Sequence, residues 1–153
     1  MHGVAATGGD VVTDTPERIA AVLVDRESYA NVLPLLHEIR HALARYHASG
    51  VETTIDLRRI PMTEADEREL ESFLGVGEVR IELRALGASH IHETRFPAVW
   101  HVVHENTEGE VAGKFVCVAS IPELVVAAPE DATRGLRALE DRLAALAPDA
   151  GAD

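Results

Sequence analysis

The segment Glu78-Val-Arg-Ile-Glu-Leu-Arg-Ala85 decides the fold of this 153-residue chain. Its apolar side chains alternate with charged ones, which predicts a β-strand with one buried face and one solvated face. We expect this segment to open three hairpin-linked antiparallel segments between Gly77 and Ala119, because turn residues separate further alternating runs. The same stretch contains the only tryptophan, the only cysteine and four of the eight histidines.

Two helices and a strand are predicted before this stretch. Apolar residues at helical spacing between Val32 and Tyr46 predict a first helix, and Gly50 marks its end. The β-branched run Val51–Leu57 predicts a strand. Thr63 then begins a second helix with a capping-box pattern, and glycines stop that helix before the central stretch.

The last helix is predicted to start near Glu130. It carries one apolar stripe, formed by Leu136, Leu139, Leu143 and Leu146. This spacing corresponds to two heptads, whereas a coiled coil needs about three or four, so we expect this helix to pack on the sheet. The order of elements predicts an α+β fold: a two-layer sandwich with a mainly antiparallel sheet of about four strands and helices on one face.

Composition bounds the organisation and the partners. Length predicts a single domain, which we place at residues 15–148 between flexible tails at 1–14 and 149–153. No apolar run approaches the roughly 20 residues of a membrane-spanning helix, and the start resembles no export signal, so we expect a cytoplasmic protein without membrane insertion. The net charge of −12 repels phosphate backbones and argues against nucleic acid as a partner.

Histidines in the central stretch suggest one candidate metal site. A three-residue reversal at Phe96-Pro97-Ala98 predicts that His90, His92 and His104 share one sheet face. Three imidazoles on one face could hold zinc, although histidines on a solvated face need no metal to explain them. We therefore expect no cofactor and keep a metal-binding protein or metalloenzyme as the alternative function.

The sequence contains no catalytic signature, but it contains a group of aromatic residues that could bind another protein. The chain has no nucleophile elbow, phosphate-binding loop or dinucleotide fingerprint, so we expect no enzyme. Phe96, Pro97 and Trp100 lie close together in sequence, flanked by Glu93 and Arg95. Aromatic residues beside an arginine are typical anchors of protein interfaces, while a lone tryptophan is also typical of a core.

Several short motifs, in order, resemble the HupH/HyaF hydrogenase expression proteins. The resemblance covers residues 51–131, and its motifs are Thr54–Leu57, Ile60–Thr63, Asp66, Leu74–Val79 and Glu93–Trp100. It implies a non-enzymatic accessory protein or chaperone in the maturation of an uptake nickel–iron hydrogenase. The implied partner is the precursor of the iron–sulfur small subunit, bound before export, alone or with other maturation accessory proteins.

The resemblance also directs attention to the residues that could meet this partner. We expect contact through one turn and one hairpin, comprising Gly75, Gly77, Glu78, Glu93, Thr94, Arg95, Phe96, Pro97 and Trp100. The family usually has glycine before Val-Trp, whereas this chain has Ala98, which predicts an ordinary backbone angle there. The resemblance implies a partner with an arginine-containing leader peptide, which the acidic net charge of this chain would attract. Self-association through the last helix remains open.

Overall fold

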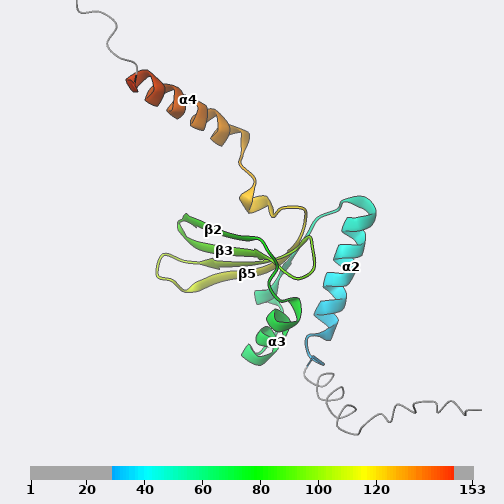
Figure 1. The fold of residues 1–153 in the computed structure, drawn as a ribbon. Coiled ribbons are helices and arrows are strands. Elements are labelled where there is room, and N and C mark those ends of the chain that lie inside the picture. Colours follow the sequence, from blue (N-terminus) through cyan, green and yellow to red (C-terminus); the bar gives the residue numbers. More distant parts are fainter. Residues whose placement is uncertain (1–28, 147–153) are drawn as a thin grey trace, which may run out of the picture.

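The computed structural model describes residues 29–146 and contains an open antiparallel sheet (Figure 1). Its five strands lie in the order β1-β5-β4-β3-β2. They are β1 (Thr53–Asp56), β2 (Arg80–Ala85), β3 (Gly87–Glu93), β4 (Val99–Glu105) and β5 (Val111–Val118). The predicted α+β class and antiparallel sheet are confirmed. The strand count differs, because Ala85 pairs directly with Gly87 and the central stretch therefore holds four strands rather than three.

Three helices and two short 3₁₀ turns complete the described chain. The helices are α2 (Leu33–Ser49), α3 (Glu64–Leu74) and α4 (Pro129–Leu146), and the turns are η1 (Leu57–Arg59) and η2 (Glu123–Val125). No helix within residues 29–146 has the length and apolar character needed to cross a membrane. The predicted tails at 1–14 and 149–153, and the two outermost parts of the predicted 15–148 domain, lie outside the described residues.

The start of α3 is held by its capping box, as its sequence predicts. Thr63 Oγ1 accepts a hydrogen bond from the Asp66 backbone N–H at 3.2 Å, and the Asp66 carboxylate accepts one from the Thr63 N–H at 2.8 Å. Asn31 Nδ2 also donates to Asp66 Oδ1 at 3.0 Å. These bonds, led by that from the Thr63 backbone, lower the pKa of Asp66. Asp66 thus ties the start of α2 to the start of α3.

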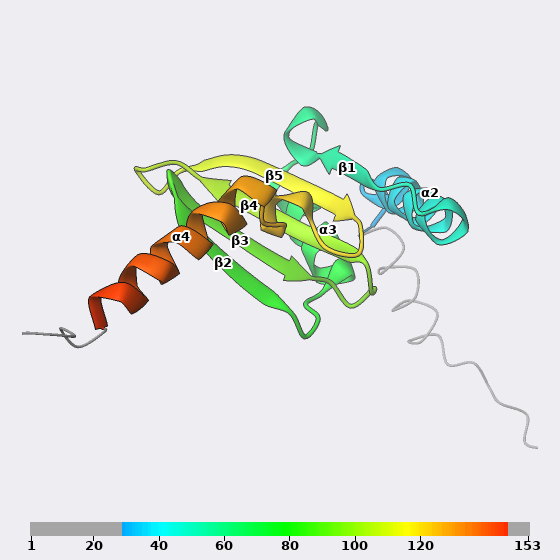
Figure 2. The ribbon, with the colours of Figure 1, turned by 90° about the horizontal axis from the view of Figure 1, so that it is seen from above.

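Helices α2 and α3 cover one side of the sheet, which we call the inner face (Figures 1 and 2). Leu35 and Ile39 of α2 and Leu70 of α3 pack there against inward residues of β1, β4 and β5. Those strand residues are Ile55, Val99, Val116 and Val118. Burial of this apolar area is the main source of stability of the described fold.

The opposite, outer face carries a smaller apolar cluster. Ile91, Trp100 and Val102 form its buried centre, and Val125 of η2 packs against them. Helix α4 follows η2 but buries none of its residues, and Figure 1 shows it extending away from the sheet. The prediction that the last helix packs on the sheet was therefore wrong: its apolar stripe is present, but no surface within residues 29–146 covers it.

Candidate functional site

An apolar groove opens between α2, the end of α3 and the β3–β4 hairpin. Its volume is about 580 Å³. The residues that line it are Tyr29, Leu33, Leu36, His37, Ile39, Arg40, Leu43, Phe73, Leu74, Phe96 and Val99. Arg40 carries the one permanent charge among these lining residues, so the groove is suited to an apolar ligand surface with a cationic group at its margin.

Three aromatic rings form a continuous row along the groove. Tyr29 and Phe73 meet edge to face with centroids 5.7 Å apart, and Phe73 stacks on Phe96 with centroids 5.8 Å apart. Phe73 is 43% exposed and Phe96 is 38% exposed. Large rings that pack together yet stay accessible are typical of sites where a protein binds another polypeptide.

The β3–β4 hairpin holds Phe96 in this position. Thr94 is only 2% exposed, and its hydroxyl both accepts from the Phe96 N–H and donates to the Phe96 carbonyl, each at 3.2 Å. Arg95 N–H donates to the Leu74 carbonyl at 2.9 Å, which joins the hairpin to the end of α3. Phe96 is therefore presented by a loop whose backbone is fixed on both sides.

Ala98 adopts a backbone angle that its side chain disfavours. Its φ is +66°, so the prediction of an ordinary angle at this alanine was wrong. The Ala98 N–H donates to Glu93 Oε1 at 3.2 Å, and the Ala98 carbonyl accepts from the Ala119 N–H at 3.0 Å. These bonds hold the chain in a conformation that costs a non-glycine residue about 1–2 kcal/mol.

Gly75 and Gly77 act through close backbone approach. Gly75 has φ +61°, and a Cβ there would lie 2.3 Å from Arg95 Nε. A Cβ at Gly77 would lie 2.4 Å from the Thr94 carbonyl oxygen, and the Gly77 N–H donates to the Glu93 carbonyl at 2.6 Å. Both glycines let the turn after α3 lie against the hairpin, so their structural effect is to support the groove.

The predicted interface residues thus divide into two groups. Phe96 lines the groove, and Glu78, Arg95 and Pro97 are exposed near it in the turn and hairpin. Trp100 is 4% exposed, lies in the outer-face cluster and donates from Nε1 to the Ala119 carbonyl at 3.0 Å. The alternative left open for this tryptophan is resolved: it is a core residue.

Sequence reasoning missed the remaining wall of the groove. Tyr29 precedes α2, Leu33 and Leu36 lie in its first turn, and Phe73 lies in the last turn of α3. Leu33 is 49% exposed although it sits in an apolar helix, and Phe73 has comparable exposure. The available signal was an apolar stripe wider than one helix contact requires.

Comparison with known proteins assigns the chain to a family. The family model described as "HupH hydrogenase expression protein, C-terminal conserved region" matches residues 29–146. The chain belongs to this family. The matched range coincides with the residues that the structure describes, so the groove and hairpin are features of a HupH-type domain.

Similar proteins carry hydrogenase-related names. The chain is 32% identical over 101 residues to the hydrogenase expression/formation protein HoxQ of Cupriavidus necator, covering 66% of this chain and 36% of that protein. It is 35% identical over 106 residues to the hydrogenase-1 operon protein HyaF of Escherichia coli, covering 66% and 35%. This HupH-type chain thus spans about a third of the length of these curated relatives.

A solved structure supports the fold of the HupH domain directly. The hydrogenase expression protein HupH from Thiobacillus denitrificans is 42% identical, with a TM-score of 0.73. The similarity covers 76% of this chain and 97% of that one. The predicted resemblance to the HupH/HyaF proteins is therefore confirmed by sequence and by structure.

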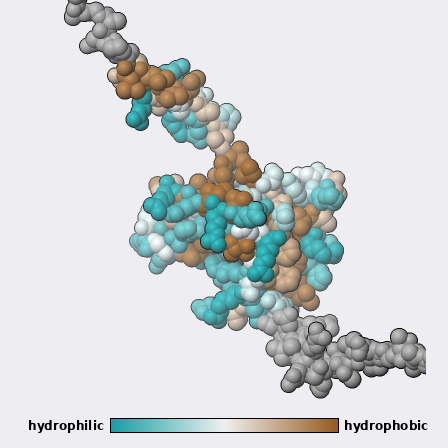
Figure 3. Space-filling model, viewed as in Figure 1, coloured by the Kyte–Doolittle hydropathy of each residue, from teal (hydrophilic) through white to brown (hydrophobic). Residues whose placement is uncertain are grey.

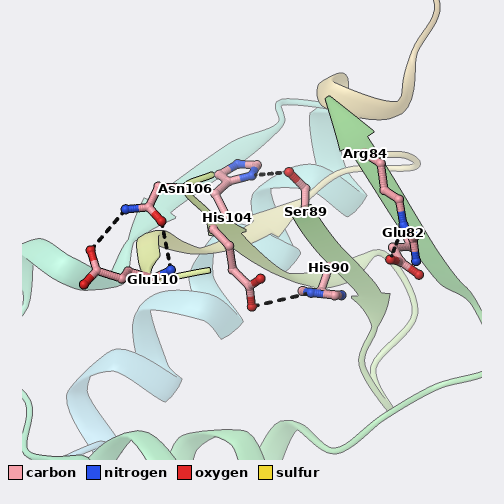
Figure 4. Close-up of polar contacts among 8 residues, drawn as sticks. Glu82, Arg84, Ser89, His90, His104, Asn106 and Glu110 are labelled. Atoms are coloured by element: carbon pink, nitrogen blue, oxygen red, sulfur yellow. Dashed lines mark hydrogen bonds and ion pairs between the residues drawn. The ribbon is translucent and has the colours of Figure 1, made fainter. Parts of the chain in front are cut away.

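The histidines of this HupH-type domain do not form the predicted metal set. His92 pairs with His101 and His90 with Val103, so these three histidines point to the inner face. His104 points to the outer face, where its Nδ1 lies 2.8 Å from Ser89 Oγ (Figure 4). The pairing is one residue out of the predicted register, which reverses the face of His104. Within residues 29–146 no group of three or more His, Cys, Asp or Glu could hold a metal.

His101 is the most strongly perturbed titratable group of the described domain. It is 5% exposed beneath α3, and its ring centroid is 5.2 Å from that of His92. Burial, followed by the nearby charges of His92 and Lys114, lowers its pKa to about 4. His101 is therefore neutral at pH 7. Lys114 is held by Glu67 at 2.5 Å and lies 3.8 Å from Glu71.

Proposed function

We propose that this chain is a non-enzymatic accessory protein of nickel–iron hydrogenase maturation that binds the immature small subunit in the cytoplasm before export. The observation that carries the proposal is the open row of Tyr29, Phe73 and Phe96 in the apolar groove. The family assignment supports it, since the similar proteins carry the names of hydrogenase expression and operon proteins.

The groove is suited to an apolar segment of an incompletely folded polypeptide. Its lining is mainly leucine, isoleucine, valine and aromatic side chains, which recognise apolar surface with little sequence selectivity. An immature subunit exposes such surface because its core is incomplete. The site would then release its ligand when folding or assembly buries that segment, which is the behaviour expected of a chaperone.

The charge of the chain adds a second, weaker contribution to this proposal. A net charge of −12 attracts an arginine-containing leader over a long range and raises the association rate. Arg40 at the groove is a local exception to the acidic balance and would meet anionic groups of the ligand. Apolar contact in the groove therefore provides the affinity, while the electrostatic field of the chain speeds the association of the ligand.

The lining of the groove supports binding rather than catalysis. Apart from His37, Arg40 and Tyr29, it consists of aliphatic and aromatic side chains. Acid–base or nucleophilic catalysis requires paired polar groups within hydrogen-bonding distance of one another. The groove residues offer no such pair, so retention of an apolar segment is the activity that fits them best.

Capture of the small-subunit precursor tests the proposal. Phe73→Ser and Phe96→Ser are each expected to lower the affinity at least tenfold, because exposed aromatic anchors dominate such interfaces. Leu86→Ser is the matched control, since Leu86 is 91% exposed in the β2–β3 turn at a distance from the groove. Unchanged capture by folded Phe73→Ser and Phe96→Ser variants would reject the groove as the site.

A second measurement separates the two contributions. Deleting the leader or raising the salt concentration should slow association without removing the groove-dependent affinity. Binding that is insensitive to both treatments would remove the electrostatic part of the proposal. Binding that disappears entirely without the leader would instead place the recognised segment within the leader.

A further inference from the structure

Helix α4 is an amphipathic helix without a surface to cover it. Its leucine stripe, Leu136, Leu139, Leu143 and Leu146, is 57%, 57%, 58% and 78% exposed. Figure 3 shows hydrophobic residues along the far part of this helix, well away from the sheet. None of the residues of α4 is buried. Within residues 29–146, α4 is the one long element that makes no contribution to a core.

At 18 residues, α4 is only slightly longer than helices that are marginal on their own in water. Helices of roughly 12–15 residues or fewer are marginal on their own, and most helical stability in proteins comes from packing of the apolar face. An 18-residue helix with four exposed leucines on one side therefore calls for a covering surface. The helix extends away from its own sheet in Figure 1, and no part of residues 29–146 covers its apolar stripe.

We propose that α4 pairs with α4 of a second copy of this chain in an antiparallel, two-fold arrangement. Full-length overlap places Pro129 of one copy opposite Leu146 of the other. The same register places Leu136 opposite Leu139 and Ala132 opposite Leu143. These are the apolar contact positions of an antiparallel helix pair, so complete overlap and correct core register coincide.

The sizes of the apolar residues suit this register. Residues on the contact side are small in the first two turns of α4, where Ala132 and Gly135 lie, and large in the last turns, which hold Leu143 and Leu146. Antiparallel pairing sets the small end of one helix against the large end of the other. The leucines then fill space that the small residues leave, and the two backbones approach evenly.

The charges beside the stripe are also complementary in this register. Asp131 of one helix lies near Arg142 of the second copy, and Arg137 lies near Glu140 of the second copy. Within a single copy Asp131 contacts Arg134, whereas Arg137, Glu140 and Arg142 form no ion pair with any residue in 29–146. Each dimer would thus contain four ion pairs beside the stripe. These favour the antiparallel orientation of the helices more than they raise the affinity.

Sedimentation of the full chain tests this dimer. Dimerisation should raise the mass from 16.5 kDa toward twice that value as the concentration increases from about 1 to 300 μM. Leu139→Glu should keep the chain monomeric throughout. Ala138→Glu, next to it but outside the stripe, is the matched control and should dimerise like the unmodified chain.

A charge exchange identifies the surface that α4 meets. Asp131→Arg alone and Arg142→Asp alone should each weaken the dimer about tenfold, because every substitution places two like pairs across the interface. The double variant should recover to within about threefold of the unmodified chain. Within one helix these two positions are about 16 Å apart along the axis, so recovery requires contact between copies.

Three results would overturn the proposal. The first is an unmodified chain that remains monomeric to about 300 μM. The second is a double charge-exchange variant that dimerises no better than the two single charge variants, although Leu139→Glu abolishes the dimer of the otherwise unmodified chain. In that case α4 would lie on the sheet of the second copy. The third is a monomeric Leu139→Glu variant whose unfolding free energy falls by more than about 1 kcal/mol, since α4 would then pack within its own chain.

Discussion

Helices α2 and α4 have nearly the same length and both carry an apolar stripe, yet they have opposite environments. Helix α2, with 17 residues, buries Leu35, Ile39 and Ala42 against the inner face of the sheet. Helix α4, with 18 residues, buries none. The difference shows that an apolar pattern at helical spacing predicts which face of a helix will be buried, but does not predict the surface against which it packs. For α2 that surface is the sheet of the same chain.

The comparison is tested most strongly by equivalent leucine truncations. Leu35→Ala in α2 should lower the free energy of unfolding by about 2–5 kcal/mol, because it leaves a cavity in the inner core. Leu139→Ala in α4 should change it by less than about 0.5 kcal/mol in dilute solution, because that side chain is already exposed. Urea unfolding measures both values. Similar costs at the two positions would break the comparison.

His101 sharpens the comparison through the pH dependence of the covered face. Its pKa is about 4 in the folded chain and about 6.5 when exposed, so the unfolded chain binds more protons between these values. Stability is therefore complete above pH 6.5 and decreases as the pH falls toward 4, by up to about 3 kcal/mol from this residue. His101→Gln should flatten that part of the unfolding profile. An unchanged slope would show that folding does not lower the pKa of His101.

Two glycines extend the same contrast to the backbone. Gly77→Ala should destabilise the chain by about 1–3 kcal/mol, because the new methyl group meets the Thr94 carbonyl. Gly135→Ala in α4 meets nothing within 4 Å and should favour the helix locally by about 0.5–1 kcal/mol. Urea unfolding and far-ultraviolet circular dichroism report the two effects. A neutral Gly77→Ala would mean that the turn and hairpin separate easily.

The smallest expected effect concerns the hairpin that presents Phe96. Ala98→Gly removes the penalty of φ +66° and should raise the unfolding free energy by about 0.5–1 kcal/mol, after the added freedom of the unfolded chain is counted. Thermal unfolding is the measurement, with Ala138→Gly in α4 as a control that should not stabilise. A destabilised Ala98→Gly variant would show that the alanine methyl group contributes packing.

Local chemistry made much of the fold predictable. The capping box of Thr63 and Asp66 forms as its spacing indicates, and Gly50 ends α2 with φ +70°. The candidate site was predicted only in part: Phe96 was identified because aromatic residues beside an arginine are typical anchors of protein interfaces. Tyr29 and Phe73 were missed as groove residues because their role depends on how α2 and α3 lie together.

The register between paired strands could not be predicted from the sequence. The predicted β3–β4 register was one residue out. It therefore placed His104 on the same face as His90 and His92, and these three histidines looked like a metal site. The hydrogen bonds of Thr94, the positive φ of Ala98 and the approach of Gly77 together decide that register. None of them is visible in the alternation of apolar residues.

The sequence by itself determined the α+β class, the antiparallel sheet, the helix ends and the family. The first three of these properties follow from periodicity, capping residues and turn residues, which act over a few neighbouring positions, whereas the family was inferred from the resemblance of several short motifs. Only the tertiary structure decided the strand register, the burial of Trp100, the aromatic groove and the exposure of α4. These features depend on which surfaces, distant in sequence, come into contact. Because apolar burial is non-directional, a pattern of apolar residues predicts that a face will be buried but does not predict which surface buries it.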